Sequence, residues 1–239
     1  MKKFEFFIFS LFIGFLGLII YTKDIYPQGN KIPGKEVREV SGFDQIASSG
    51  DFKVMVKHGN SYSVEVKAES NLLPYIKTEV VDHLLIIKTR GFRTLLENNP
   101  IEVFITTPDL KALYLSGSGM IKTGHFVSDR FRIILSGSGY IDTNISTELM
   151  KAVVSGSGNI FLEGVAKVGR FAICGSGRIK SYQTQQRNCE AVILGSGKIF
   201  LNTLETIDAR ITGSGRVLYI NHPTVNKNIY GSGEVYNDN

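Results

Sequence analysis

The second half of the chain repeats one pattern of apolar and polar positions seven times. Each copy surrounds a Gly-Ser-Gly triplet, and the last glycines of successive triplets lie 18 to 20 residues apart. A fixed period of this length is the signature of a repeat protein, in which each copy adds one structural unit to a stack. These glycines are Gly119, Gly139, Gly158, Gly177, Gly197, Gly215 and Gly233.

Counting from the last glycine of each triplet shows which positions face the core. Position +2 is Ile or Val in all seven copies, and position −4 is always apolar. Position −6 is apolar in six copies and is Lys227 in the last copy. Side chains two residues apart lie on the same face of a strand, so positions −6 and −4 line one interior. The pattern therefore predicts an all-β fold in which residues 111–239 form a parallel β-helix-like solenoid of about seven coils of 18–20 residues.

The triplets themselves are predicted to form corners. Glycine adopts positive φ and lets neighbouring backbones approach closely, which a corner between stacked strands requires. A phosphate-binding loop would need a helix after the glycines, a calcium β-roll would need a recurring aspartate, and a flexible linker would lack the apolar columns. The polar segments midway between triplets, such as 124–130 and 144–150, vary from copy to copy. We expect them to form loops at one corner, where binding specificity would reside.

Residues 36–110 contain shorter strand-like runs. The segment 58–60, His-Gly-Asn, is predicted to be a hairpin turn joining two of these runs, 49–51 a degenerate corner, and 72–76 a short helical turn. This β-rich half is expected to begin the stack and to cap its open edge, because solenoids need covered ends. The predicted strands are Phe43–Ala47, Phe52–Lys57, Tyr62–Lys67, Leu84–Lys88 and Ile101–Thr106.

Residues 1–24 are predicted to direct export across the inner membrane. Lys2 and Lys3 precede a run without charge at 6–21, which is typical of a secretory signal. We favour an uncleaved membrane anchor over a cleaved signal, because no Ala-x-Ala pattern follows the run. Residues 25–35 hold two prolines and two glycines and are predicted to be a linker. The remaining domain, 36–239, is expected in the cell envelope, either periplasmic or on the surface.

Composition narrows the choice of partners only slightly. The net charge of +5 and the pI of about 9.1 suit anionic surfaces but do not by themselves indicate nucleic acid. The two cysteines, Cys174 and Cys189, are expected to point to opposite sides of the strand layer, so we predict two free thiols. An exported fold with so few cysteines does not depend on disulfides.

Several phrases of the sequence carry a resemblance to a known family. The chain reads Val-Ser-Gly-Phe-Asp-Gln-Ile at 40–46, Asn-Leu-Leu at 71–73 and Thr-Pro-Asp-Leu-Lys at 107–111, and a Ser-Gly-Ser-Gly-x-Ile series begins at Ser116. On these motifs, residues 36–239 resemble the head GIN domain of putative autotransporter adhesins. The resemblance implies a right-handed β-helix-like fold and an envelope location, and it brings no catalytic residues with it. Unlike many members, this chain has no lipoprotein cysteine after its apolar run.

The sequence shows no metal-binding motif, and no cofactor is expected. The histidines form no HxH, HExxH or HxxE motif, so each is interpreted as a separate surface or turn residue. They are His58, His83, His125 and His222.

No catalytic residues are predicted either. A glycosidase needs two facing carboxylates, whereas stacking is expected to place Asp142 against Phe161 and Glu163 against Tyr182. The sequence leaves open whether the acids of the expected loops converge. These acids are Asp129, Glu148 and Glu205.

One exterior column of cations suggests a binding surface. Position +1 carries Arg178, Lys198 and Arg216 on three consecutive coils, and Lys180 lies two residues after the first of them. Stacking would place these side chains one coil rise apart, which suits an anionic polymer such as an acidic polysaccharide or lipopolysaccharide. The alternative is a solvated charged face that prevents pairing with other sheets.

These observations favour a non-enzymatic, adhesin-like binding module of the cell envelope that recognises an anionic polysaccharide or an envelope protein. One alternative is a structural, self-associating envelope component, and a second is a polysaccharide-active enzyme. The first function predicts saturable, salt-sensitive binding. The second predicts oligomers without a ligand, and the third predicts turnover that a carboxylate substitution abolishes.

Overall fold

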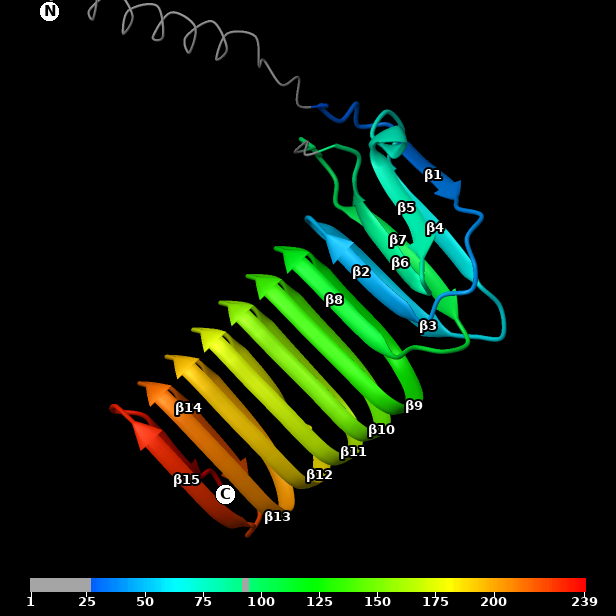
Figure 1. The fold of residues 1–239 in the computed structure, drawn as a ribbon. Coiled ribbons are helices and arrows are strands. Elements are labelled where there is room, and N and C mark those ends of the chain that lie inside the picture. Colours follow the sequence, from blue (N-terminus) through cyan, green and yellow to red (C-terminus); the bar gives the residue numbers. More distant parts are fainter. Residues whose placement is uncertain (1–26, 92–94) are drawn as a thin grey trace, which may run out of the picture.

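The described part of the chain is almost entirely β-structure. The computed structural model describes residues 27–91 and 95–239. In these residues sixteen strands join into one sheet, and the only helical element is a 3-10 turn, η1 (Leu73–Tyr75). Figure 1 shows the strands stacked side by side along one axis, with β1 near one end of the stack and β15 near the other.

The strands fall into a short N-terminal set and a set that forms the solenoid. The N-terminal strands are β1 (Pro33–Val37), β2 (Gln45–Ser49), β3 (Phe52–His58), β4 (Ser63–Glu69), β5 (Ile76–Val81), β6 (Leu84–Thr89) and β7 (Ile101–Thr107). The solenoid consists of β8 (Ala112–Gly117), β9 (Met120–Gly137), β10 (Tyr140–Gly156), β11 (Asn159–Gly175), β12 (Arg178–Gly195), β13 (Lys198–Gly213), β14 (Arg216–Ile220), β15 (Thr224–Tyr230) and β16 (Glu234–Asn237).

Each long strand from β9 to β13 makes one complete coil, running from one Gly-Ser-Gly triplet to the next. Neighbouring coils are parallel and in register, so Ile141 pairs with Ile121 of the preceding coil and Ile160 of the following coil. The prediction of an all-β, parallel solenoid of about seven turns is confirmed.

The loops expected midway between triplets do not form in the coils β9–β13. Those segments continue the strands because they also pack inward, with Phe126 2% and Ile145 0% exposed. Differences in coil length are absorbed by register shifts, for example between Asp142 and Asn144. A bulge accommodates an extra residue without leaving the sheet, so the prediction of loops is wrong for these coils.

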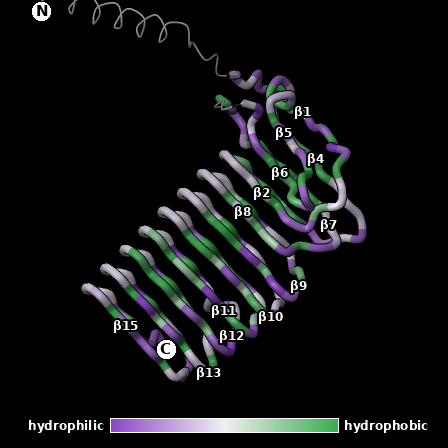
Figure 2. The backbone as a smooth tube through the Cα atoms, viewed as in Figure 1, coloured by the Kyte–Doolittle hydropathy of each residue, from purple (hydrophilic) through white to green (hydrophobic). Residues whose placement is uncertain are grey.

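The interior of the stack is filled by the predicted apolar columns. Figure 2 shows apolar and polar residues alternating along the coils, as expected when one face of each strand is buried. The position +2 side chains Ile141, Ile160 and Ile179 are all 0% exposed. Burying one such side chain stabilises the fold by roughly 1.5–3 kcal/mol. The apolar column at position −6 ends in the last coil, where Lys227 is exposed.

The two glycines of each triplet meet different requirements. The first has positive φ in every triplet, between 113° and 124°. The last is not in that region, but it lies where side chains leave no room. A Cβ on Gly177 would lie 2.5 Å from Cγ1 of Val154 and 2.6 Å from the carbonyl oxygen of Gly158. The first glycine therefore permits the turn, and the last permits the close packing beneath it.

The N-terminal strands cover the first coils. On one side β3 pairs in parallel with β9 and β7, β4 pairs antiparallel with β7, and β1 closes the edge on β4. On the other side β2 pairs with β8 and β6, and β5 pairs antiparallel with β6. Antiparallel strands at this end take up the backbone groups that a further coil would otherwise pair.

Most local predictions for the N-terminal half are confirmed, but the hairpin is wrong. All five predicted strands are present within two residues at each end, and the turn expected at 72–76 is η1. Gly50 forms the expected corner, with φ of 126° and a carbonyl that accepts a hydrogen bond from the N–H of Gly119 at 3.1 Å. The chain at 58–60, however, does not join paired strands. The two edges of β3 pair with β7 and β9, and β4 pairs with β7 instead of β3. Strands β1 and β5 were not predicted.

Part of the segment predicted as a linker, 25–35, belongs to the β-structure, since β1 begins at Pro33. The predicted signal or anchor, 1–24, lies outside the described residues. Within 27–91 and 95–239, no helix has the length and apolar character needed to cross a membrane. In the described residues the core cluster runs from Phe43 to Val217, so residues 27–239 carry a hydrophobic core, which is what a domain needs to fold alone.

A buried carboxylate ties the N-terminal segment to the cap. Glu69 is 1% exposed and accepts hydrogen bonds from the backbone N–H of Lys31 at 2.6 Å and of Asn98 at 3.0 Å. The side-chain amide of Asn98 donates a third hydrogen bond, at 3.0 Å. The hydrogen bonds, led by that from the Asn98 backbone, lower the pKa of the Glu69 carboxyl group although burial opposes them.

Acid is therefore expected to loosen this end of the fold. Because the pKa of Glu69 is depressed in the folded state, its contribution to stability is complete above the pKa of an unfolded glutamate, about 4.3, and is lost as pH falls through the folded-state value. Glu69→Gln is expected to lower the unfolding temperature at neutral pH and to flatten its fall in acid. Thermal unfolding of residues 27–239 between about pH 3 and pH 7 measures both effects. Glu39→Gln, at an exposed carboxylate, is the control. An unchanged acid slope in Glu69→Gln would contradict this account.

Candidate functional site

The structure brings the four predicted cations together on strands that follow the Gly-Ser-Gly corner. Arg178 pairs with Lys198, and Lys198 with Arg216, in the parallel register of β12, β13 and β14. Lys180 lies two residues after Arg178 on β12 and therefore on the same face. We call these four side chains the first cation row.

The first cation row is only partly neutralised. Nε of Arg216 lies 3.1 Å from Oε2 of Glu234 on the last coil. Within the described residues, Arg178 and Lys198 make no ion pair. Two neighbouring cations, about 4.8 Å apart along the stack, are thus available to an anionic ligand.

A hollow of about 480 Å³ lies beside this row and is lined by aromatic rings. The ring centroids of Tyr140 and Phe161 are 4.9 Å apart, and those of Tyr182 and Phe200 are 5.4 Å apart. Nζ of Lys180 lies 4.6 Å from the centroid of Phe161, a cation–π contact that joins the row to the hollow. We call this site the aromatic hollow. Such rings offer flat apolar faces, which suit the apolar faces of sugar rings.

The polar groups around the aromatic hollow include an acid and two phenols, those of Asp142, Tyr140 and Tyr182. Oδ2 of Asp142 lies 3.1 Å from Nζ of Lys122, and this hydrogen bond raises the pKa of Lys122. Burial raises the pKa of Tyr140. Burial, followed by a hydrogen bond to Asp238, raises the pKa of Tyr182. Both phenols therefore keep their protons at physiological pH.

The carboxylate of Glu163 does not lie where the sequence analysis expected it. Asp142 faces Phe161 as predicted. A register shift after Phe161, however, pairs Glu163 with Gln183 rather than with Tyr182. The bulge moves the following residues by one place relative to the neighbouring coil, a change that alignment on the glycines does not reveal.

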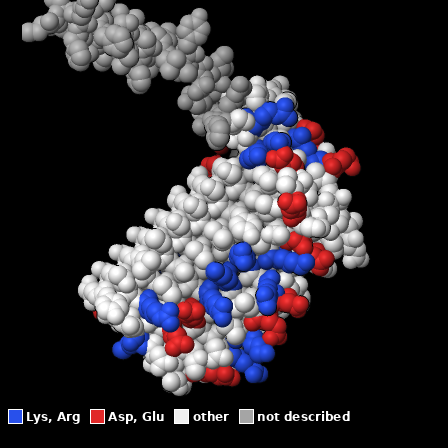
Figure 3. Space-filling view, viewed as in Figure 1, with Lys and Arg blue, Asp and Glu red and all other residues white. Residues whose placement is uncertain are grey.

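Sequence reasoning missed a second row of cations, which precedes the corner. Position −7 carries Arg132, Lys151 and Arg170, which pair in register across β9, β10 and β11. All three side chains are exposed, and none makes an ion pair within the described part of the chain. We call them the second cation row. Figure 3 shows Lys and Arg side chains, with Asp and Glu side chains among them, over the part of the visible face away from the arrowheads of Figure 1, and an uncharged area nearer the arrowheads.

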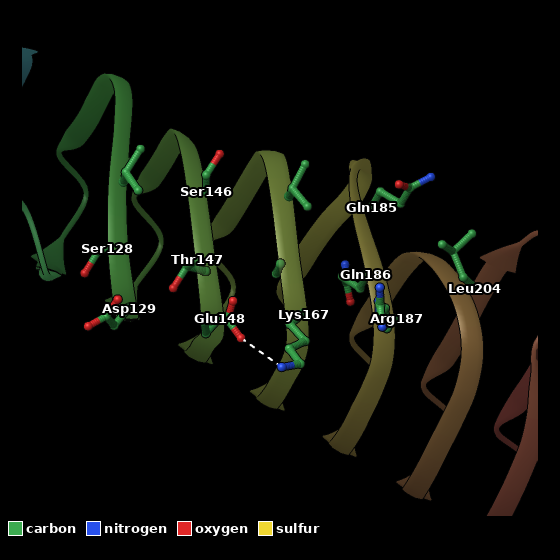
Figure 4. A pocket seen from close by; sticks show the side chains of 13 residues that line it. Ser128, Asp129, Ser146, Thr147, Glu148, Lys167, Gln185, Gln186, Arg187 and Leu204 are labelled. Carbon is green, nitrogen blue, oxygen red and sulfur yellow. Dashed lines mark ion pairs between the residues drawn. The ribbon is translucent and has the colours of Figure 1, made fainter.

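A groove of about 640 Å³ runs along the corner midway between triplets. Figure 4 shows Glu148, Lys167 and Arg187 following one another along one side of this corner groove. The apolar side chains of Val127 and Leu204, which are 71% and 44% exposed, also line the groove. The region in which loops were expected is therefore a groove formed by strands.

Two of the acids that the sequence left open line the corner groove, namely Asp129 and Glu148. Glu205 instead accepts a hydrogen bond from Asn188 at 3.4 Å. Both groove carboxylates are exposed, and Glu148 lies 3.2 Å from Nζ of Lys167 in an ion pair. They thus lack the apolar surroundings in which the acid of a glycosidase acts.

The histidines and cysteines do not form a metal-ligand cluster in the described ranges. His125 lies 3.0 Å from Oγ of Ser146, and His83 lies 2.9 Å from the carbonyl oxygen of Gly42. In the described ranges no three His, Cys, Asp or Glu side chains gather to hold a metal ion. Both cysteines are free, as predicted, with Cys174 exposed and Cys189 buried. Burial raises the pKa of the Cys189 thiol, which makes it unreactive.

Three solved structures that share this fold are a putative lipid binding protein and two putative adhesins. A putative lipid binding protein from Parabacteroides distasonis is 25% identical, with 89% of this chain and 99% of that chain covered and a TM-score of 0.74. A putative adhesin from Bacteroides fragilis is 22% identical, with 88% and 99% covered and a TM-score of 0.83. A putative adhesin from Parabacteroides merdae is 19% identical, with 89% and 98% covered and a TM-score of 0.69.

Sequence comparison agrees with the motifs noted above. A search of curated proteins found no match. A family model described as "Putative auto-transporter adhesin, head GIN domain" matches residues 42–223, which is well over half of the chain and includes the aromatic hollow and both cation rows. The chain therefore belongs to the putative auto-transporter adhesin head GIN domain family.

Proposed function

We propose that this protein is a non-enzymatic, adhesin-like module of the cell envelope that binds an anionic polysaccharide along the first cation row. The observation that carries the proposal is the register of β12, β13 and β14, which aligns Arg178, Lys198 and Arg216 along the stack. A polymer with one negative charge per sugar, lying parallel to the stack axis, would meet successive cations at the inter-strand spacing of about 4.8 Å.

The aromatic hollow supports the choice of a polysaccharide over other polyanions. Phe161 and Phe200 line the hollow, where they would pack against sugar rings. The carboxylates of Asp142 and Glu163 on the same rim would accept hydrogen bonds from hydroxyl groups. The family membership supports an adhesin-like role and an envelope location.

Polygalacturonate, which carries one carboxylate per sugar, is the probe for this proposal, with neutral dextran as its control. Residues 27–239 are expected to bind polygalacturonate saturably and less tightly as salt rises. Arg178→Ala/Lys198→Ala/Arg216→Ala is expected to weaken binding roughly 10- to 100-fold, at up to about 1 kcal/mol per exposed cation. Isothermal titration calorimetry at low and high salt measures the change.

A single substitution provides the matched control. Glu234→Gln frees Arg216 from its ion pair and is expected to strengthen binding of polygalacturonate. Equal binding by the triple variant and the unchanged protein would contradict the proposal, as would equal binding of dextran.

A further inference from the structure

We infer that the second cation row, together with an uncharged strip beside it, is a docking surface for an anionic lipid bilayer. This surface lies on the strand segments that precede the Gly-Ser-Gly corner, whereas the first cation row lies on those that follow it. The inference therefore assigns a second partner, and it does not depend on the binding of polysaccharide.

The second cation row forms a line of positive charge along the stack. The register Arg132–Lys151–Arg170 places the three cations on consecutive coils, about 4.8 Å apart. Arg130, two residues before Arg132, adds a fourth exposed cation on the same face. Of the two acids that follow at position −7, Glu190 is paired with Arg210 at 3.2 Å, and Asp208 lies one coil farther from the row and accepts a hydrogen bond from Asn226.

The strip beside the row carries no charge across five strands. Its side chains are those at positions −5 and −3 of β8–β12, which share the face of position −7 because strand side chains alternate. The apolar members at position −5 are half-buried and lie close to the sheet surface, and Leu194 at position −3 is 51% exposed. The strip consists of Tyr114, Ile134, Val153, Ala172 and Val192 at position −5, and Ser116, Ser136, Ser155, Cys174 and Leu194 at position −3.

The shape of this surface fits a bilayer better than a polymer. The residues that line the corner groove and the aromatic hollow are not those of the row and the strip, and the one aromatic side chain of the strip, Tyr114, is half-buried. The surface therefore offers charge and area rather than an aromatic platform for a single chain. A plane of anionic headgroups can contact the whole row at once, because juxtamembrane cations are attracted to anionic lipid. The uncharged strip then approaches the interface without the penalty of desolvating a charge. Both features run along the stack axis, so the solenoid would lie on its side on the membrane.

Vesicle binding tests the inference on residues 27–239, which omit the apolar N-terminal run. Vesicles of phosphatidylcholine with phosphatidylglycerol are expected to bind the protein at low salt and to release it at high salt, and phosphatidylcholine alone is expected not to bind it. Arg132→Gln/Lys151→Gln/Arg170→Gln is expected to weaken partitioning roughly 100-fold, given the attraction of each cation to the anionic surface. Co-sedimentation gives the partition coefficient. Soluble glycerol phosphate in excess is expected not to compete, which separates a bilayer from a single headgroup.

Matched variants locate the surface. Arg178→Gln/Lys198→Gln/Arg216→Gln removes the same charge on the other side of the corner and is expected to leave vesicle binding nearly unchanged.

The strip itself is tested with one added charge. Ser155→Glu places a carboxylate on the strip and is expected to weaken binding, whereas Gln185→Glu adds the same charge at the corner groove and is expected not to.

Three results would overturn the inference. These are no binding to phosphatidylglycerol vesicles at low salt, equal losses in the two triple variants, and loss of polygalacturonate binding rather than vesicle binding in the second-row variant. The first two do not bear on whether the first cation row binds polygalacturonate, so there the two proposals fail separately. The third would contradict both proposals, because it would move the polymer to the second cation row.

Discussion

Replacing Gly175 with alanine is expected to destabilise the solenoid by roughly 3 kcal/mol or more, although it adds only one methyl group. Gly175 has φ of 124°, a region that alanine adopts only with strain. The added Cβ would also lie 2.5 Å from the carbonyl oxygen of Gly156. That oxygen cannot move away, because it accepts hydrogen bonds from the N–H groups of Ser176 and Gly177, each at 3.0 Å.

Each residue of this triplet offers a matched comparison. Ser176→Ala changes an exposed side chain between the two glycines and is expected to alter stability by less than about 0.5 kcal/mol. Gly177→Ala is expected to destabilise as well, since its Cβ would meet Val154 and the backbone of Gly158. Chemical denaturation of residues 27–239 gives the free energies of unfolding. If Gly175→Ala had the same free energy of unfolding as Ser176→Ala, the corner would not have this geometry.

The second large effect is expected at Phe171, the one aromatic residue at position −6. Its ring is 2% exposed and pairs in register with Ala152 and Ala191 of the neighbouring coils. The ring therefore fills space that its small neighbours leave empty. Phe171→Ala would place four alanines in succession, at 152, 171, 191 and 209, and because none of them can fill the void, we expect a loss of about 3–5 kcal/mol.

A compensating change tests this packing. Ala152→Leu in the Phe171→Ala background is expected to restore part of the lost stability, whereas Ala152→Leu alone is expected to destabilise by overpacking. Val153→Ala, on the outward face of β10 next to Ala152, is the control and is expected to have a smaller effect. The same denaturation experiment measures all four proteins. Additive effects of the two core substitutions would contradict direct contact across coils.

The architecture could be predicted because each coil repeats the same constraints. Position +2 is β-branched and position −4 apolar in every copy, so one alignment determined both the strand face and the parallel register. The middle of each coil was mistaken for loops because bulges change the alternation there. Phe126 and Ile145 are buried and in register, yet their distances from the preceding glycine differ, so the alignment did not reveal a column.

The partner of β4 was wrongly predicted because it depends on a distant segment. Turn residues at 58–60 describe only the local chain, whereas β7 comes from 101–107 and enters between β3 and β4. Local turn chemistry contains no information about which strand occupies an edge.

The candidate site was predicted in part for similar reasons. Three members of the first cation row follow from position +1 alone and are present as a line of paired residues. The aromatic hollow needs Tyr182, whose placement depends on the bulge after Phe161. The second cation row lies at position −7 of the same alignment, but only three of the seven copies carry a cation there and two carry an acid, so the column does not stand out as positive.

The measurement that tests the central claim most directly is binding of polygalacturonate and of phosphatidylglycerol vesicles to both triple variants side by side. The two variants lose the same charge, so any difference between them reports where the charge lies. We predict a crossed result: the variant of Arg178, Lys198 and Arg216 loses polygalacturonate and keeps the vesicles, and the variant of the second cation row does the reverse. Equal binding of polygalacturonate by both variants would show that net charge, and not the first cation row, attracts the polymer, and would contradict the account.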